Sequence, residues 1–460
     1  MDFAFVHSAA NLADWLGIQS TQRQNGTQGI TITARFMDPK RRFIYIYGDS
    51  SRTRLKITRS MLAQIFTYHQ VMPDYLDFIF AFGFSGSSRL LKFSSFREHT
   101  SLRVPQPGSA IPQLGRSGRQ FQLCYNLKGT WQMGVPDDVV WMAQEAAFYH
   151  QFDVLSGNML WIVTKGRLDL HSRIKDWTNV SENPDNRAFG TVEDCFRSSL
   201  STQLLFSHWS TEGWRNHIEW LYHKEQQGTY EMSERSEGPG EDKLGSGGAD
   251  IQQLQWLEDR ANEIIGLLEG NVYVLGALQK FYLALSTDSD FPLRPCGSDI
   301  NTFSNKLGHF MEEFRMQVAS TRTFVKSVAD RKELINKYIE RQAAQRAERL
   351  NRNMEREAVV VRIVTIVTLI YLPATFVSTF FSTDIIKYQS GDKNGTFSPI
   401  AMNRWLQVTL PLTFLTILVA WLGDRWAQTH RPADNRLREG ERPCVWRRRF
   451  WPNAIFEKEP

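Results

Sequence analysis

The stretch TLIYLPATFVSTFFSTDIIKYQ, residues 368–389, contains the end of an uncharged run that extends from Ile363 to Phe381. As a helix, these nineteen residues would cover roughly 28 Å, close to the hydrocarbon thickness of a bilayer. A second uncharged run covers residues 405–423, with Trp405 and Trp421 placed where interfacial aromatic side chains are expected. The sequence therefore predicts two membrane-spanning helices, 363–381 and 405–423. The alternative is a buried helical hairpin in a soluble protein.

Basic residues are concentrated on the outer flanks of these two runs. Six arginines lie at 341–362 and eight lie at 425–449, whereas the loop 382–404 carries three basic residues against two acidic ones. By the positive-inside rule, both termini are expected in the cytosol and the loop 382–404 outside. Residues 424–460 are then a basic cytosolic tail of a multi-pass membrane protein, for which we favour the plasma membrane. The amino terminus lacks the pattern of a cleaved signal peptide.

A long helical pattern leads into the first apolar run. Apolar residues recur at steps of three and four from Ile300 to Ile339, and no proline interrupts the pattern before Pro373. This spacing predicts one helix from about Ser298 to Phe381. A shorter helical series covers 250–285, so residues 250–362 are interpreted as a cytosolic helical stalk.

Residues 1–223 have the mixed pattern of a cytosolic α/β domain, and the whole chain is assigned to the α+β class. Strands are expected at 29–37 and 42–48, joined as a hairpin through the turn DPKR, and again at 121–127 and 159–165. Helical spacing appears at 61–66 and 191–223, and the proline-rich segment 101–119 is expected to be a loop. Residues 224–249 hold few large apolar groups, which predicts a disordered linker.

Composition argues against several other classes of protein. A net charge of +5 over 460 residues is too small for a nucleic-acid footprint, so we expect no nucleic-acid partner. The four cysteines are far apart and form no metal-binding or disulfide pattern. No HExxH, P-loop or GxSxG motif is found, so the protein is not expected to be an enzyme or to hold a cofactor.

One face of the first predicted span alternates hydroxyl and aliphatic side chains. A helix places on this face Val364, Thr368, Leu372, Thr375, Thr379 and Ser382. If several copies packed around an axis, the face could line a narrow aqueous path. The alternative is that the hydroxyls bond to their own helix or across a helix pair, as is common in membranes. Pro373 is expected to kink the helix and is tolerated in a membrane.

The long helix, the two C-terminal spans and the junction VRIVTIVTLIYLPATFVSTFFSTD (361–384) resemble the CorA family of divalent-cation channels, in particular the CorA-like membrane proteins of filamentous fungi. The resemblance is good from residue 250 onward and loose over the N-terminal domain. The resemblance implies a homopentamer with the first spans around the pore. It also implies apolar constrictions at Leu372 and Val364 and a polar ring at Thr375, within the family's P-x-T setting that begins at Pro373.

The family's Gly-Met-Asn filter is replaced here by Ser382, Thr383 and Asp384. A ring of Asp384 carboxylates would bind metal at the outer mouth and raise the local cation concentration. The alternative is that Asp384 ends the helix and pairs with Lys387. Mg²⁺ is the favoured ion, and the competing hypothesis is a non-conducting scaffold or signalling protein that has lost the filter. Acidic residues of the long helix could form cytosolic Mg²⁺ sites between subunits or a solvated face; they are Glu312, Glu313, Asp330 and Glu333.

Overall fold

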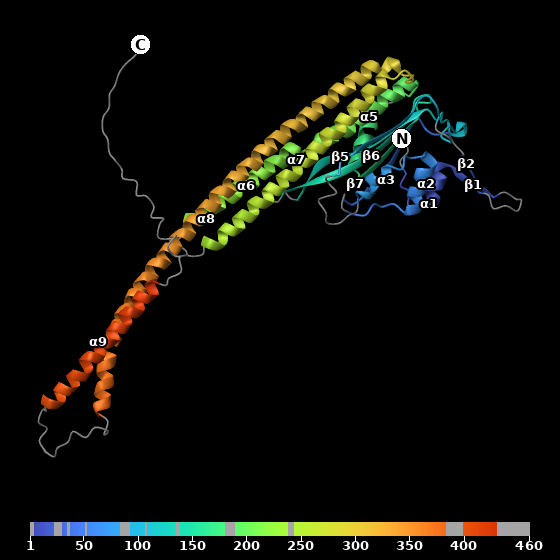
Figure 1. The fold of residues 1–460 in the computed structure, drawn as a ribbon. Helices are drawn as coiled ribbons and strands as arrows, with labels where there is room; N and C mark the ends of the chain where they lie inside the picture. The colour runs from blue at the N-terminus through green and yellow to red at the C-terminus, as the bar shows by residue number, and fades with distance from the viewer. Residues whose placement is uncertain are drawn as a thin grey trace, which may run out of the picture. The chain divides into compact units, whose positions relative to one another are not determined.

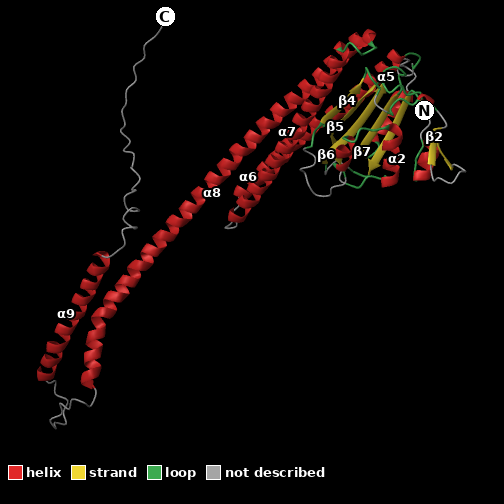
Figure 2. Ribbon diagram, turned by 45° about the vertical axis from the view of Figure 1, so that its right-hand side comes forward, coloured by secondary structure: helices red, strands yellow, loops and turns green. Residues whose placement is uncertain are grey.

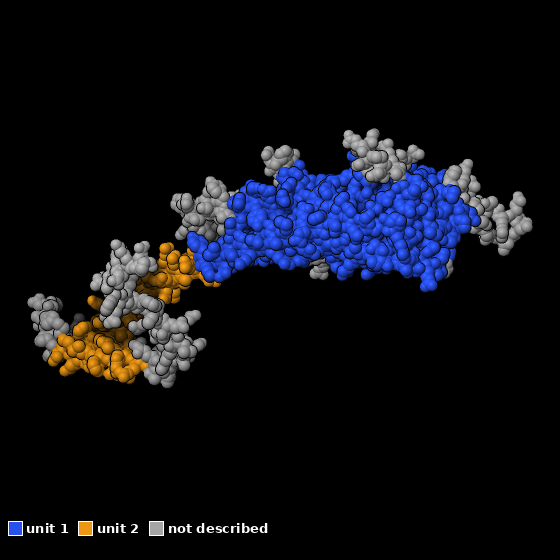
Figure 3. Space-filling model, turned by 90° about the horizontal axis from the view of Figure 1, so that it is seen from above, with its two compact units in different colours: residues 1–339 blue, residues 340–460 orange. Residues whose placement is uncertain are grey.

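The computed structural model describes residues 4–22, 30–34, 37–50, 53–82, 93–105, 108–134, 139–179, 189–237, 243–382 and 399–429. The chain divides into two compact units, residues 1–339 and residues 340–460 (Figure 3). The strands are β1 (Ile18–Gln22), β2 (Ile30–Ala34), β3 (Arg41–Gly48), β4 (Phe96–Ser101), β5 (Gln120–Met133), β6 (Val140–Asp153) and β7 (Met159–Gly166). The α-helices are α1 (Ala9–Leu16), α2 (Arg59–His69), α3 (Tyr75–Phe80), α4 (Asp169–Asn179), α5 (Val192–Thr211), α6 (Trp214–Glu237), α7 (Lys243–Thr287), α8 (Gly297–Ser382) and α9 (Pro399–Thr429).

A five-stranded sheet in the order β3-β7-β6-β5-β4 is the centre of the first unit (Figure 2). β3 and β7 are parallel, and every other neighbouring pair in this sheet is antiparallel. Side chains alternate between the two faces of each strand, and both faces are covered by helices. One face packs under α1, α2 and α3, and the other packs under α5, α6, α7 and the first part of α8.

The strands predicted at 29–37 and 42–48 exist as β2 and β3, but the predicted hairpin between them is wrong. β2 pairs with β1, and β3 pairs with β7. The intervening turn residues are anchored to the segment that leads into β7. The Lys40 ammonium donates to the Ser156 carbonyl at 2.5 Å, and the Lys40 carbonyl accepts from the Met159 amide at 2.9 Å. These bonds hold the start of β3 beside the start of β7, so β3 joins the five-stranded sheet while β2 pairs with β1.

The disordered linker predicted at 224–249 is also wrong wherever the structure describes it. α6 continues to Glu237 and α7 begins at Lys243, and only 238–242 lie outside the described residues. Glutamate, glutamine, methionine and lysine are good helix formers, so a lack of large apolar groups does not prevent a helix that packs on a neighbour. Gly228 permits this packing, because a Cβ there would lie 2.9 Å from the Gln253 amide nitrogen.

The predicted long helix is confirmed as α8, Gly297–Ser382, within one residue at each end of the range expected from the spacing. In the first unit its apolar stripe is buried among α5, α6 and α7; the stripe includes Ile300, Phe303, Leu307, Phe314 and Val318. Figures 1 and 2 show α6, α7 and this part of α8 side by side. The same spacing that predicted the helix thus supplies the packing that holds it.

Candidate functional site

Two helices among the described residues are long and apolar enough to cross a membrane: α8, and α9 over Asn403–Leu422. Only 6% of the apolar window of each helix is buried within the chain. A core helix of a soluble protein would be mostly buried, so the buried-hairpin alternative is not supported. Apolar side chains on this scale require a lipid or protein environment outside the chain.

α8 and α9 contact each other through one face of each helix in the second unit. On α8 this face contains Pro373 and Val377, which are both buried, and on α9 it contains the buried Thr409. The Trp405 indole nitrogen donates to the Ser378 hydroxyl at 3.3 Å. A proline at this position interrupts the backbone ladder of α8 without ending the helix.

The predicted hydroxyl stripe lies on the opposite face of α8. All six of its residues are exposed within the chain, with Leu372 67% and Val364 56% exposed. At 100° per residue, the stripe residues lie within about 40° of one direction, and Pro373 and Val377 lie roughly 140–180° away. The structure therefore brings the six predicted residues to one face and leaves that face uncovered by α9.

The threonine hydroxyls of the stripe donate to carbonyls of their own helix. Thr368 donates to the Val364 carbonyl at 3.0 Å, Thr375 to the Leu372 carbonyl at 3.0 Å, and Thr379 to the Thr375 carbonyl at 2.9 Å. This is the alternative arrangement, in which the hydroxyls bond to their own helix. A hydroxyl that donates in this way keeps its oxygen lone pairs, so the exposed stripe presents hydrogen-bond acceptors.

Part of the predicted outer mouth cannot be placed. Ser382 is the last residue of α8 and is exposed, whereas Thr383 and Asp384 lie outside the described residues. Within the described ranges, no group of three or more histidine, cysteine, aspartate or glutamate side chains could hold a metal ion. The role of Asp384 as a metal ligand stays a prediction.

The acidic residues of the stalk helix are exposed in the single chain. Glu312 pairs with Arg315 at 3.2 Å, and Glu333 pairs with Lys337 at 2.6 Å. The hydrogen bond from Lys337 lowers the pKa of the Glu333 carboxyl. Glu313 and Asp330 are exposed as well. These contacts are those of a solvated face, and cation sites between subunits stay a prediction.

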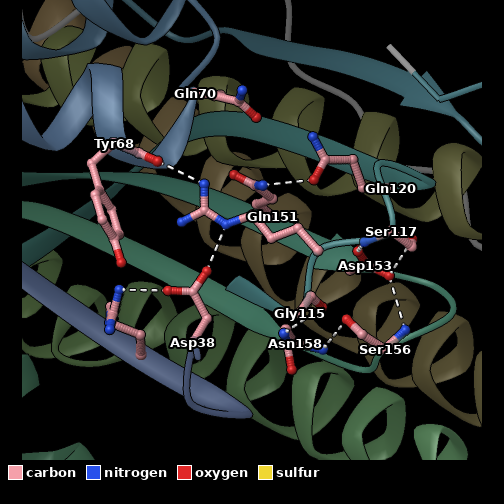
Figure 4. Close-up of polar contacts among 12 residues, drawn as sticks. Asp38, Tyr68, Gln70, Gly115, Ser117, Gln120, Gln151, Asp153, Ser156 and Asn158 are labelled. Atoms are coloured by element: carbon pink, nitrogen blue, oxygen red, sulfur yellow. Dashed lines mark hydrogen bonds and ion pairs between the residues drawn. The ribbon is translucent and has the colours of Figure 1, made fainter. Parts of the chain in front are cut away.

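A polar cluster in the first unit lies beneath the C-terminal end of α2 (Figure 4). The Arg116 guanidinium contacts the Asp38 carboxylate at 2.6 Å and donates to the Tyr68 carbonyl at 2.6 Å. The Gln122 amide donates to the carbonyl of Gln70, which has a positive φ of 53°. Both donors satisfy carbonyls that the helix end leaves unpaired. The cluster therefore has a structural role in holding α2 on the sheet.

A buried ion pair joins β5 and β6. The Lys128 ammonium lies 2.6 Å from the Glu145 carboxylate, and neither side chain is more than 3% exposed. Asn126 also donates to Glu145 at 2.5 Å, and the Asn271 side chain bonds both backbone groups of Lys128 at 2.7–2.8 Å. Burial lowers the pKa of the Lys128 ammonium, and the attraction of Glu145 opposes that shift.

Two histidines are buried on the same side of the sheet as α5 and α6. His150 shares a hydrogen bond of 2.8 Å with the Ser199 hydroxyl, and His217 shares one of 2.9 Å with the Thr130 hydroxyl. Burial lowers the pKa of each to about 3. Both rings are therefore neutral at neutral pH and serve the core.

Comparisons with known proteins place this fold in a family. The model of the family described as CorA-like transporters matches residues 2–233, and no curated protein matches the chain. The match covers the N-terminal half, where the sequence resemblance was loosest.

Solved structures with some likeness include three proteins. The CorA magnesium transporter from Methanocaldococcus jannaschii is 9% identical, with a TM-score of 0.25 and coverage of 65% of this chain and 75% of that one. The full-length CmaX protein is 13% identical, with a TM-score of 0.25 and coverage of 64% and 74%. The ZntB cytoplasmic domain from Vibrio parahaemolyticus RIMD 2210633 is 11% identical, with a TM-score of 0.30 and coverage of 67% and 95%. At these TM-scores the three likenesses add nothing to the family match.

The family match and the two apolar helices agree with each other, because a transporter must lie in a membrane. Since residues 2–233 make up half of the 460-residue chain, the protein belongs to the family of CorA-like transporters.

Proposed function

We propose that the chain forms a homopentameric channel that moves divalent metal cations across a membrane, with Mg²⁺ the favoured ion. The observation that carries this proposal is the exposed hydroxyl and aliphatic stripe of α8, on the face opposite α9. If copies of the chain bring these stripes together around an axis, α9 falls on the outside, toward lipid. The arginine-rich flanks of the two spans favour a cytosolic location for both termini, and the plasma membrane is the favoured location.

The chemistry of the stripe suits a hydrated cation. Mg²⁺ gives up its water reluctantly, and the water molecules around a cation point their hydrogen atoms outward. Thr368, Thr375 and Thr379 donate to their own helix and therefore offer acceptor lone pairs to those hydrogens. The Leu372 and Val364 side chains would form apolar constrictions that close the path when water leaves it.

The outer mouth in this proposal is formed by Ser382, Thr383 and Asp384. One Asp384 carboxylate from each copy would attract divalent cations and hold them more strongly than neutral amides would. Conduction also requires release of the ion. We therefore expect this mouth to bind cations more tightly and to conduct them more slowly than a mouth of neutral amides.

Reconstitution of the full chain in liposomes tests the proposal, with Mg²⁺ entry followed by an entrapped fluorescent indicator. Thr375→Val removes the hydroxyl oxygen at nearly constant shape. The hydrated cation then loses hydrogen-bond acceptors at this position, which should raise the barrier to its passage by at least ~1.4 kcal/mol and slow entry about tenfold. Thr416→Val is the matched control, since Thr416 of α9 also donates to its own helix, at 2.8 Å from the Thr413 carbonyl.

The result decides between the two hypotheses. Uptake by the wild-type chain that falls in Thr375→Val and persists in Thr416→Val supports the channel. No Mg²⁺ uptake by a correctly inserted wild-type chain would favour the non-conducting scaffold. A subunit count by native mass spectrometry in detergent tests the pentamer separately.

A further inference from the structure

The exposed stripe of α8 continues below the first span. Moving toward the N-terminus from Val364, steps of three and four lead to Val361, Glu357, Met354 and Leu350. These side chains are all exposed, with Val361 63%, Met354 66% and Leu350 63% exposed. At 100° per residue, the five residues lie within about 40° of the direction of Thr368. Glu357 is therefore an acidic residue set into an apolar seam.

The charges around Glu357 are arranged in an unusual way. Arg349, Arg352, Arg356 and Arg362 lie roughly 100° or more from the direction of Thr368. The next arginine toward the N-terminus, Arg346, lies within about 40° of that direction, roughly 16 Å from Glu357 along the helix. Arg352 pairs with Glu348 at a point away from the seam. Glu357 makes no hydrogen bond or ion pair with any residue that the structure describes. Between Leu350 and Val364, the stripe carries no other charge.

We propose that Glu357 lines the cytosolic mouth of the conduction path and determines its preference for cations over anions. This inference rests on the proposed channel, because the acidic ring forms only when copies of α8 meet along this stripe. Each copy then contributes one carboxylate, two helical turns or about 10 Å from the Val364 constriction. Arg349, Arg352, Arg356 and Arg362 point to the outer faces, where they can contact lipid headgroups. Arg346 faces the axis about two Debye lengths from the Glu357 ring, so its charge is largely screened there.

The distances make the ring effective at this position. A carboxylate about 10 Å from the constriction lies close to one Debye length, ~8 Å at physiological ionic strength, so it acts on ions at the inner mouth but only weakly on ions at the outer mouth. Clefts lined by one sign of charge raise the local concentration of the opposite ion at least tenfold. The outer carboxylate at Asp384 and the inner carboxylate at Glu357 would therefore act independently.

Glu357→Gln tests the proposal by removing the charge at nearly constant shape. With ~1 mM Mg²⁺ and low salt, the initial rate of entry into liposomes should fall at least about tenfold, and Glu357→Asp should restore most of it. The matched control is Glu355→Gln, which removes the same charge at almost the same depth but from the opposite face of α8, and it should retain the wild-type rate. Added choline chloride at ~0.5 M should erase the difference by screening, which a folding defect would not do. Equal rates in the two glutamine variants would overturn the proposal.

A second measurement reads the position of Glu357 without relying on flux. Glu357→Cys is made in a Cys444→Ser background, since Cys124, Cys195 and Cys296 are buried. A short bis-maleimide should join copies through Glu357→Cys, whereas Glu355→Cys should stay monomeric on denaturing gels. If the wild-type chain moves no Mg²⁺ but Glu357→Cys cross-links, the proposed channel function is refuted, whereas the contact between copies along the stripe at Glu357 is supported. If both cysteine variants behave alike, this inference fails whatever the transport result.

Discussion

Replacing Glu145 with glutamine leaves the buried Lys128 ammonium without the carboxylate that lies 2.6 Å from it. The lysine can then stay charged in a dry environment or lose its proton. The second route sets an upper bound on the cost, because deprotonating a lysine of unfolded pKa ~10.4 at pH 7 costs about 4.6 kcal/mol. Loss of one partner of a buried ion pair typically costs about 3–5 kcal/mol, so we expect about 3–4.6 kcal/mol of destabilisation. With an unfolding entropy of roughly 2.1 cal/mol/K per residue over the first unit, residues 1–339, this corresponds to about 4–7 °C in Tm.

The pH dependence gives this prediction a distinct signature. Burial lowers the pKa of Lys128 in the folded chain, and removing Glu145 lowers it further. The unfolded chain then binds more protons, so stability rises with pH up to about 10.4. Between pH 7 and 9, Glu145→Gln should therefore regain part of its lost stability relative to the wild type, at most about 2.7 kcal/mol.

Thermal unfolding of the full chain in detergent, followed by tryptophan fluorescence, measures the change. Hydrogen exchange of peptides from β5 and β6 locates it. Glu212→Gln is the control, because the Arg173–Glu212 pair is 41% and 36% exposed and should be worth less than about 1 kcal/mol. A Glu145→Gln variant that melts with the wild type, or that shows no recovery at pH 9, would refute this account of the pair.

Acidification from pH 7 to 5 should destabilise the first unit by about 4 kcal/mol. Burial lowers the pKa of His150 and of His217 to about 3, whereas the pKa in the unfolded chain is ~6.5. The unfolded chain therefore binds the protons first, and each histidine lowers the free energy of unfolding by ~2 kcal/mol over this range. Melting curves in detergent at pH 5, 6 and 7 check this, and a single His150→Asn or His217→Asn substitution should halve the slope; equal melting temperatures at pH 5 and 7 would contradict it. Asp384→Asn should raise the Mg²⁺ concentration for half-maximal entry at least about threefold, through loss of the attracting charge, while Asp392→Asn in the same loop should not. Identical concentration curves for the two loop variants would assign Asp384 to the helix end.

Elements with an uninterrupted apolar period were predictable from the sequence. α8 follows a stripe from Ile300 onward, and its observed bounds agree with the spacing. The two spans were predictable because an uncharged apolar run of nineteen residues is typical of a membrane-spanning helix. The six stripe residues were brought to one face as expected, since helical geometry alone fixes which residues share a face.

β6 was missed because its core positions hold polar residues. Its sequence places Glu145, His150 and Gln151 among alanines and aromatics, which hides the alternation of a strand. Each polar group is satisfied by a residue distant in sequence: Glu145 by Lys128, His150 by Ser199, and Gln151 by Gln120 at 2.6 Å. Such partners are set by tertiary contacts, which no local pattern reveals.

The face of α8 that contacts α9 could not be predicted from the sequence either. Hydroxyl spacing was compatible with either a path or a helix contact, and only the burial of Val377 and Thr409 separated the two faces. The placement of Asp384 remains a prediction, because the residue lies outside the described ranges.

Pro373 gives α8 a mechanical property that its length alone would not. Without an amide hydrogen at 373, the Leu369 carbonyl loses its rung in the ladder, and Figures 1 and 2 both show the helix turning aside close to its C-terminal end. A helix that lacks one backbone hydrogen bond bends most easily at that point. Thr375 and Thr379 lie on the C-terminal side of this bend and Val364 lies on its N-terminal side. The segment with the two threonines can therefore move relative to the segment with Val364.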